Sequence, residues 1–361
     1  DAHGAGRGAL GSVGVGTSLW NLPADTASSN YTHFLVYTKS SLLEQSTPAS
    51  LEFTDTAEGV SALAFEDLDL DQGDIGGAVT WAEPANASAT HAYKIYLAVD
   101  TFGASRSQIG TSVLLGTNQV DLPLDTAQQS FSFVVAYTSS VLAEQSTPVA
   151  VPCLDIEASV SGVLFVDLDL DAMEFGGTVT WSPPAATEAR VHEYLAYFAN
   201  DTSGLGRQQA GAAIPVGTNA ALLPADFLQG NYTHVLVYAK SALGEQTTPA
   251  ADSVYDAVGS VADLTLVDQD LDGAEVGGTV TWSPPVDEDR VAEYVLYLAA
   301  GSPPSSRSQV GAAISNGTSR AAVPADTGLG NFTHVAVYSR SPLAEQTTPA
   351  AAELADSDGT V

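Results

Sequence analysis

The feature that most constrains this chain is a repeat of about 100 residues, marked by four strings that recur in register. Their recurrence predicts a tandem array of similar domains, which excludes a single large fold. A Glu-Gln-(Ser/Thr)-Thr-Pro string begins at Glu44, Glu144, Glu245 and Glu345, and a Gly-Gly-x-Val-Thr-Trp block ends at Trp81, Trp181 and Trp282. A Pro-Ala-Asp-Thr string or a close variant begins at Pro23, Pro123, Pro224 and Pro324, and a Gly-Thr pair at Gly16, Gly116, Gly217 and Gly317.

The markers also predict the domain boundaries. Residues 59–158, 159–259 and 260–359 each carry the whole set and are expected to be full repeats. Residues 1–58 lack the Gly-Gly-x-Val-Thr-Trp block and match only the second half of a repeat, while residues 360–361 match the start of a further one. We therefore expect residues 1–58 to be ordered only when they are covered by polypeptide from outside this chain, either upstream sequence or a neighbouring copy.

Each repeat is predicted to be all-β. The chain has 32 Gly and 18 Pro, and turn residues interrupt short apolar runs every 8 to 15 residues. Seven short strands in 100 residues indicate a sandwich of two sheets, so the whole chain is expected to be a linear array of such sandwiches. Pro183-Pro184 and Pro224 are expected to end strands, because proline cannot donate a hydrogen bond to a neighbouring strand.

The order of motifs within a repeat resembles a fibronectin type III domain, an immunoglobulin-like β-sandwich. In the repeat of residues 159–259, Thr-Val-Thr-Trp-Ser-Pro-Pro is followed by Glu-Tyr-Leu-Ala-Tyr, by Thr-His-Val-Leu-Val-Tyr-Ala-Lys-Ser and by a Thr-Thr-Pro ending. The resemblance implies that the Trp of the second strand lies in the core. The Asp-Leu-Asp-Leu-Asp string before Gly-Gly-x-Val-Thr-Trp is similar to long tandem-repeat surface proteins of unicellular algae.

Charge and composition exclude several classes of function. Asp and Glu number 43 against 11 Lys and Arg, a net charge of −32, so the chain repels phosphate backbones and we expect no nucleic-acid partner. No run of 18 apolar residues exists, so no membrane span is expected in this segment. The single cysteine, Cys153, excludes an intramolecular disulfide framework and a cysteine-based zinc site.

Four acidic side chains recur within eight residues in each full repeat. If they alternate along a strand, three carboxylates lie on one face about 7 Å apart, and oxygen ligands of this kind suit Ca²⁺, which extracellular modules bind with Kd of about 10⁻⁴–10⁻³ M. The alternative is a solvated acidic strand edge that discourages edge-to-edge pairing. The acids are Asp67, Asp69, Asp71 and Asp74, then Asp167, Asp169, Asp171 and Glu174, and then Asp268, Asp270, Asp272 and Glu275.

Glycosylation sequons are enriched, because six of the nine Asn residues begin Asn-x-Ser/Thr without an intervening Pro. The alternative for any single site is a turn Asn that happens to precede Thr. The set favours N-linked glycans and therefore a secreted, extracellular or cell-surface protein. The sequons begin at Asn30, Asn86, Asn200, Asn231, Asn316 and Asn331.

Catalysis is not expected. His33, His234 and His334 share a position that is Phe133 in the remaining repeat, which is typical of packing. One arginine per repeat, Arg7, Arg106, Arg207 and Arg307, is expected to pair with the Glu of the Glu-Gln-(Ser/Thr)-Thr-Pro string. The Trp of each full repeat is expected in the core, and Trp20, which is off that position, on the surface.

These features favour a structural protein of an extracellular fibre or cell-surface filament, glycosylated, with no cofactor other than Ca²⁺. Its expected partners are copies of itself or adjoining repeats of a longer chain, in head-to-tail or lateral contact. The alternative is an array of adhesive modules that bind a carbohydrate or a protein, for which only Phe102 and Trp20 offer candidate aromatic contacts.

Overall fold

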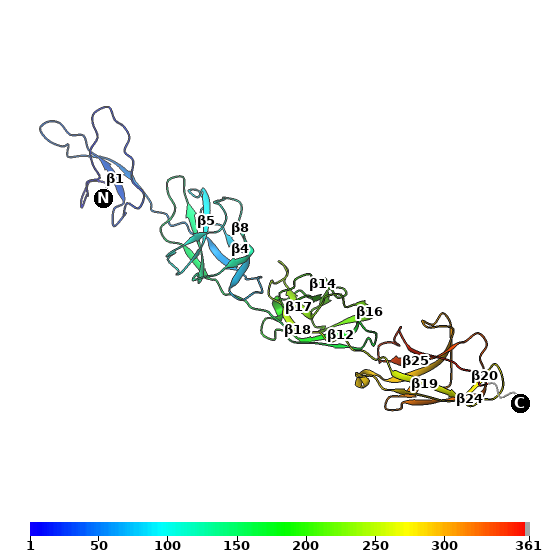
Figure 1. Cartoon of the computed structure of the whole chain (residues 1–361). Coiled ribbons are helices and arrows are strands. Elements are labelled where there is room, and N and C mark those ends of the chain that lie inside the picture. Colours follow the sequence, from blue (N-terminus) through cyan, green and yellow to red (C-terminus); the bar gives the residue numbers. More distant parts are fainter. Residues whose placement is uncertain (358–361) are drawn as a thin grey trace. The chain divides into compact units, whose positions relative to one another are not determined.

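The computed structural model describes residues 1–357, so the expected start of a further repeat at residues 360–361 lies outside the described part. The described chain forms two compact units. The first comprises Asp1–Asp69 and Gly73–Asp155, and the second comprises Leu70–Gln72 and the residues from Ile156 onward. Figure 1 labels some of the strands of each unit.

In the first unit, the repeat of residues 59–158 is built from two antiparallel sheets. One has the strand order β3-β4-β8 and the other β10-β9-β5-β6, with β7 also paired to β5. The strands are β3 (Ser61–Phe65), β4 (Asp74–Ala82), β5 (Ala92–Ala98), β6 (Ser107–Gln108), β7 (Val113–Leu114), β8 (Gln119–Ala127), β9 (Phe133–Ser139) and β10 (Val149–Pro152).

The second unit holds two further repeats with the same topology. In residues 159–259 the sheets are β11-β12-β16 and β14-β13-β17-β18, with β15 paired to β13. The strands are β11 (Ser161–Asp167), β12 (Glu174–Ser182), β13 (Glu193–Ala199), β14 (Gln208–Gln209), β15 (Ile214–Pro215), β16 (Ala220–Leu228), β17 (His234–Lys240) and β18 (Ala250–Ser253), and η1 (Glu188–Arg190) is a short 3₁₀ helix.

In residues 260–359 the sheets are β19-β20-β24 and β22-β21-β25-β26, with β23 paired to β21. The prediction of tandem two-sheet sandwiches is therefore confirmed. The strands are β19 (Ala262–Asp268), β20 (Glu275–Ser283), β21 (Glu293–Ala299), β22 (Arg307–Gln309), β23 (Ile314–Ser315), β24 (Arg320–Gly328), β25 (His334–Arg340) and β26 (Ala350–Glu353), and η2 (Glu288–Arg290) is a 3₁₀ helix.

The Gly-Gly-x-Val-Thr-Trp block is the second strand of each sandwich. Trp181 on β12 is buried and its ring lies edge-on to that of Tyr194 on β13, with ring centroids 5.5 Å apart, so it joins the two sheets as expected. Gly177 has φ +150°, and a Cβ there would lie 2.3 Å from the carbonyl oxygen of Val166 on β11. Only glycine fits this close approach of two strands.

The expectation that Pro224 ends a strand is wrong. Strand β16 continues through it from Ala220 to Leu228. The pairing of β16 with β12 shifts register between the pairs Gly177↔Leu223 and Phe175↔Phe227, so Pro224 falls in an irregularity of the ladder. A proline at a bulge costs no ladder hydrogen bond.

Residues 1–58 form only one two-stranded sheet, of β1 (His33–Val36) and β2 (Ala49–Glu52). The sequence around β1 matches that around β17, but Val36 is 68% exposed whereas its counterpart Val237 is fully buried. Leu51 is exposed as well. Apolar side chains of this sheet are thus left uncovered by the described residues, and the expectation that other polypeptide covers them stays a prediction.

Candidate functional site

The recurrent acids lie mostly in the loop between the first two strands of each repeat. Strand β11 ends at Asp167, and Asp169 and Asp171 follow in the loop, so the expected alternation along a strand is wrong. The physical reason is local. The backbone N–H of Asp169 donates to Oδ1 of Asp167, and that of Asp171 donates to Oδ1 of Asp169. Each carboxylate thus holds the backbone in a turn by binding the N–H two residues further along the chain.

The first acid of each set is a structural acceptor. Oδ1 of Asp167 accepts the backbone N–H groups of Asp169 and Gly176, and its Oδ2 accepts that of Ala257 in the linker to the next repeat. Asp268 repeats this pattern with Asp270, Gly277 and Ser357. Both carboxylates fix loop and linker rather than face an open site.

The two equivalent carboxyls nevertheless have opposite pKa shifts. Burial raises the pKa of Asp167 to about 6, although backbone N–H groups from Ala257 and Gly176 oppose it. For Asp268 burial also raises the pKa, but the hydrogen bonds from Gly277 and Ser357 outweigh it, and the pKa is lowered. The difference follows from how deeply each carboxyl is covered.

The later acids of the second unit come together in two groups. In each group one oxygen per residue lies within 4.8 Å of the others, a spacing that can hold a metal ion. Burial and then repulsion from Asp326 raise the pKa of Glu275, which is the electrostatic sign of crowded carboxylates. The groups are Asp169, Asp171 and Glu174 in one repeat, and Asp270, Asp272, Glu275 and Asp326 in the next.

Asp326 was missed by the sequence prediction, although it belongs to the recurrent Pro-Ala-Asp-Thr string. Its backbone N–H donates to Oδ2 of Asp270 at 2.6 Å, which brings the two carboxylates together. The periodic Asp of this string was an available signal, but the fold had to be known before it could be placed beside the loop. The corresponding N–H of Asp226 donates to Asp169 in the same way.

In the first unit the same loop begins with Asp67, whose Oδ1 accepts the N–H groups of Asp69 and Gly76. Asp69 in turn accepts the N–H of Asp125, the counterpart of Asp326. Asp74 is the first residue of β4. Asp71 belongs to the second unit.

Asp171 has a second set of partners in the repeat that follows it. Its carboxylate accepts the backbone N–H of Thr347 at 2.5 Å and that of Thr348 at 2.8 Å, and also the hydroxyl of Thr348. These threonines belong to the Glu-Gln-Thr-Thr-Pro string, to which the sequence assigned no partner of this kind. Asp171 is 2% exposed as a result. It therefore joins two repeats.

Leu170, next to Asp171, is a hydrophobic plug in the same junction. It is 1% exposed and packs with the core residues Val261 and Trp282 of the following repeat. Its carbonyl accepts the N–H of Gly259 in the linker, and a Cβ on Gly259 would lie 2.7 Å from the Cβ of Leu170. The linker needs a small residue here because the plug lies directly against it.

Two further contacts complete the junction. A guanidinium N–H of Arg290 donates to the carbonyl of Asp167 at 2.7 Å, and the hydroxyl of Ser341 donates to that of Leu168 at 2.6 Å. Within the same unit, Leu70 lies in the core of residues 159–259, and Asp71 accepts the N–H groups of Thr247 and Thr248. The arrangement therefore occurs twice.

The expected Arg–Glu pairs are confirmed in all four segments. The salt bridges are 2.7 Å for Arg7–Glu44, Arg106–Glu144 and Arg207–Glu245, and 2.9 Å for Arg307–Glu345. The guanidinium of Arg207 also lies 4.4 Å from the ring centroids of both Tyr197 and Tyr238. In each full repeat the Arg thus ties β13 and β17, or their counterparts, to the Glu-containing loop, whereas Arg7 lies over the ring of Tyr37.

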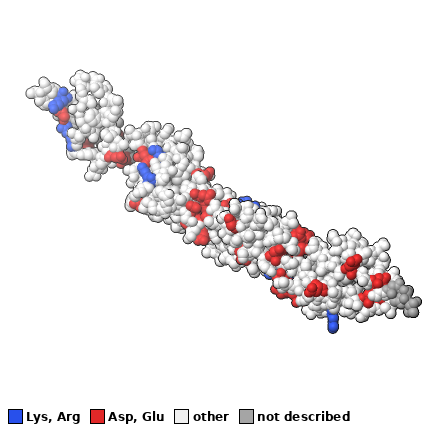
Figure 2. All heavy atoms as spheres, viewed as in Figure 1, with Lys and Arg blue, Asp and Glu red and all other residues white. Residues whose placement is uncertain are grey.

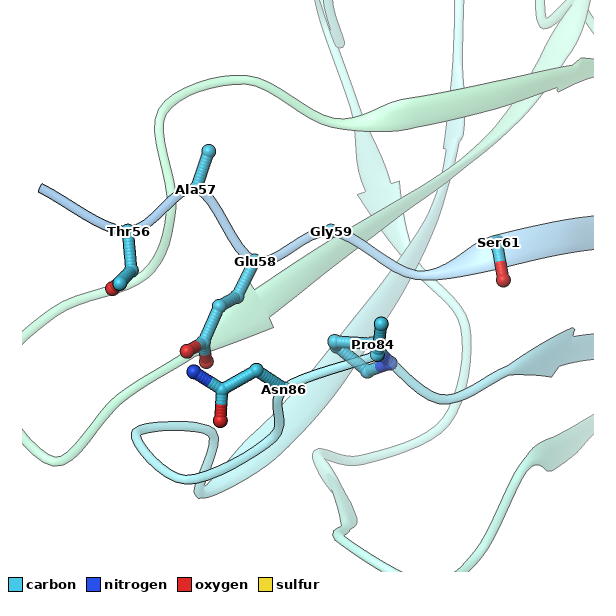
Figure 3. A pocket seen from close by; sticks show the side chains of 8 residues that line it. Thr56, Ala57, Glu58, Gly59, Ser61, Pro84 and Asn86 are labelled. Carbon is cyan, nitrogen blue, oxygen red and sulfur yellow. The ribbon is translucent and has the colours of Figure 1, made fainter.

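All six sequon Asn residues are exposed and lie in turns or loops. Asn86 lines a hollow of the first unit together with Glu58, Gly59 and Pro84 (Figure 3). The side chains of Glu58 and Asn86 lie side by side in this view. Glu58 occupies the linker position that is Ala158 and Gly259 in the other two repeats. In those repeats the backbone N–H of the linker residue donates to the carbonyl of Leu70 or Leu170.

The remaining candidates are placed as expected. His33, His234 and His334 are half-buried, and each accepts or donates a hydrogen bond with the hydroxyl of the preceding Thr. Trp20 is exposed. Cys153 is buried, which raises the pKa of its thiol to about 12. Figure 2 shows many acidic and few basic side chains on the visible face, as the composition requires.

Each full repeat has the two-sheet topology and the buried Trp of the second strand that the resemblance to fibronectin type III domains implies. Among solved structures the chain is similar to the FN1–FN3 domains of chicken CNTN1, with 14% identity, coverage of 82% of this chain and 98% of that chain, and a TM-score of 0.25. It is also similar to the central fibronectin III array of RIM-binding protein, with 12% identity, coverage of 84% and 99%, and a TM-score of 0.20.

No protein-family model matches the chain, and no curated protein does. Among residues 1–357 there is no helix with the length and hydrophobicity needed to cross a membrane.

Proposed function

We propose that this chain is a structural repeat protein of an extracellular fibre or cell-surface filament, without catalytic activity. The observation that carries the proposal is the junction that occurs twice in the second unit, in which a loop of one repeat is bound by the next. Loops that join successive repeats support a structural role, in which the assembled array of repeats is the functional form of the protein. Its partners are adjoining repeats or other copies of the chain, in head-to-tail or lateral contact.

Imaging of the native material tests this role. A regular fibre whose axial period is a multiple of one repeat is the expected result. Isolated, unassembled chains on the cell surface, bound to a ligand, would contradict it.

N-glycosylation is part of the proposal and supports the extracellular location. All six sequon residues are exposed, which is what attachment of an oligosaccharide to the Asn side chain requires. Peptide mass spectrometry of native protein should detect hexosamine on Asn231 and Asn331. Unmodified Asn at both positions would remove the main support for secretion.

Calcium binding is the second part of the proposal. The group of Asp270, Asp272, Glu275 and Asp326 offers four carboxylate oxygens within 4.8 Å of one another, in a protein of net charge −32. Hard oxygen ligands and excess negative charge suit Ca²⁺ at extracellular concentrations. The acids of the other repeats form smaller candidate groups, and Asp171 already accepts hydrogen bonds there.

An adhesive array is the second candidate function. Phe102 is 82% exposed in a turn, and Trp20 is also exposed, so both are accessible to a carbohydrate or a protein. A glycan-array screen of the full chain tests this reading. Binding that is lost in Phe102→Ala would favour it over the structural role.

A further inference from the structure

We infer that the loop of residues 268–272 in the last full repeat is an interaction surface for a further repeat of the same type, which binds Leu271 and Asp272. The inference deepens the structural role proposed above and rests on it for the biological purpose of the contact. The binding itself is argued from the two junctions of the second unit.

The counterpart loop shows what this surface binds. Leu170 is buried in the core of the following repeat, and the carboxylate of Asp171 accepts two backbone N–H groups from Thr347 and Thr348. Apolar and charge-assisted contacts therefore act together at one point. Leu70 and Asp71 make the same two kinds of contact, so the arrangement is a recurring feature of the fold.

Among residues 1–357, the loop of residues 268–272 has the same chemistry, and its Leu and Asp lack the burial seen in the two junctions. Leu271 and Asp272 align with Leu170 and Asp171, but Leu271 is 67% exposed and Asp272 is exposed. The loop keeps its internal hydrogen bonds, because the N–H of Asp270 donates to Asp268 and that of Asp272 to Asp270. The surface is therefore preorganised, and its leucine presents apolar area to water.

The partner must supply three features. The first is a small linker residue, such as Ala158 or Gly259, beside the buried leucine. The second is a Thr-Thr-Pro loop whose backbone N–H groups donate to the aspartate. The third is a hydroxyl, such as that of Ser341, that donates to a backbone carbonyl of the acidic loop. The repeat of residues 59–158 does not meet the first requirement, because Glu58 occupies the linker position. The fitting partner is thus a repeat with Ala or Gly there, such as residues 158–259 or 259–357 themselves.

Thiol labelling tests the inference, because the only native cysteine, Cys153, is buried and the pKa of its thiol is raised. In the full chain, Leu170→Cys should react with a maleimide at least about tenfold more slowly than Leu271→Cys, since it is accessible only when the junction opens. Adding Asp171→Ala should accelerate labelling in Leu170→Cys, whereas Asp272→Ala should leave labelling in Leu271→Cys unchanged. The unsubstituted chain gives the background.

The partner is tested in a chain extended after Val361 by a second copy of residues 262–357. The extension should slow labelling in Leu271→Cys to the rate seen in Leu170→Cys, and Asp272→Ala should partly restore it. Equal labelling in Leu170→Cys and Leu271→Cys, or no protection by the added repeat, would overturn the inference. Slower labelling of Leu271→Cys in the extended chain, together with native material that forms no fibre, would support the inference while contradicting the proposed function.

Discussion

The acidic loops of residues 167–171 and 268–272 have nearly the same sequence and different surroundings. In the first, Leu170 and Asp171 are almost completely buried by the repeat that follows. In the second, Leu271 and Asp272 are exposed, and their carboxylate neighbours form the larger of the two acidic groups in the second unit. One motif therefore serves as a junction in one place and as an open anionic site in the other.

The two loops also differ in electrostatics, because Asp167 is more deeply buried than Asp268. Asp167 and Asp268 accept the same kinds of backbone hydrogen bonds, yet burial raises the pKa of Asp167 to about 6 while the hydrogen bonds hold that of Asp268 below its usual range. Asp171 is used to join repeats, whereas its counterpart Asp272 is exposed.

The largest expected contrast is between Leu170→Ala and Leu271→Ala. Leu170→Ala removes a buried side chain from the core of residues 260–357 and should lower the free energy of unfolding of that repeat by about 2–5 kcal/mol. Leu271→Ala, at an exposed position, should change it by about 0.5 kcal/mol or less. Urea unfolding of the full chain, followed by Trp fluorescence, measures both. Equal changes in the free energy of unfolding for the two substitutions would contradict the difference in burial between the loops.

The next contrast concerns Asp171→Ala and Asp272→Ala. Without Asp171, the N–H groups of Thr347 and Thr348 lose their acceptor, which should cost about 1–3 kcal/mol and speed exchange of these amides. Asp272→Ala should be neutral within about 0.5 kcal/mol. Hydrogen exchange by NMR gives a direct readout, and unchanged protection of Thr347 and Thr348 in Asp171→Ala would count against the junction.

Calcium should produce a smaller difference in stability between the two loops. At a concentration ten times Kd, one bound ion stabilises the repeat of residues 260–357 by about 1.4 kcal/mol. Asp326→Asn should abolish this gain, while the matched control Asp226→Asn should preserve it, because Asp226 is not a member of the other acidic group. Calorimetric titration and melting with millimolar Ca²⁺ measure the effect. A gain that survives in Asp326→Asn would place the ion elsewhere.

The smallest expected effect is a difference in pH dependence. The pKa of Asp167 is raised when folded, so its contribution to stability is full below the ordinary carboxyl pKa and is lost as pH rises through about 6. The pKa shift of Asp268 has the opposite sign, so the contribution of Asp268 to stability is lost as pH falls through its lowered pKa. Carbon-13 NMR titration of the two carboxyls checks this, with Asp167→Asn and Asp268→Asn to assign the signals. Coincident titrations would refute the difference in burial.

Much of the fold could be predicted from the sequence because its signals are local and repeated. The buried Trp of the second strand and the four Arg–Glu pairs follow from residues at fixed spacing in every repeat. Pro224 was misread because a bulge, which depends on pairing with β12, removes the cost of a proline inside a strand. Asp326 was missed because it reaches the acidic loop only across the sheet.

The sequence by itself determined the period, the all-β class and the positions of the acids and sequons, since each is written in residue type and spacing. Only the tertiary structure decided what the Asp-Leu-Asp loop does. The contacts of Asp171 with Thr347 and Thr348 span 176 and 177 residues, and no local pattern separates Leu170 from Leu271. Burial is a property of the neighbour that covers a side chain, and so Leu170 is buried where the following repeat covers it, while Leu271 is exposed among the described residues.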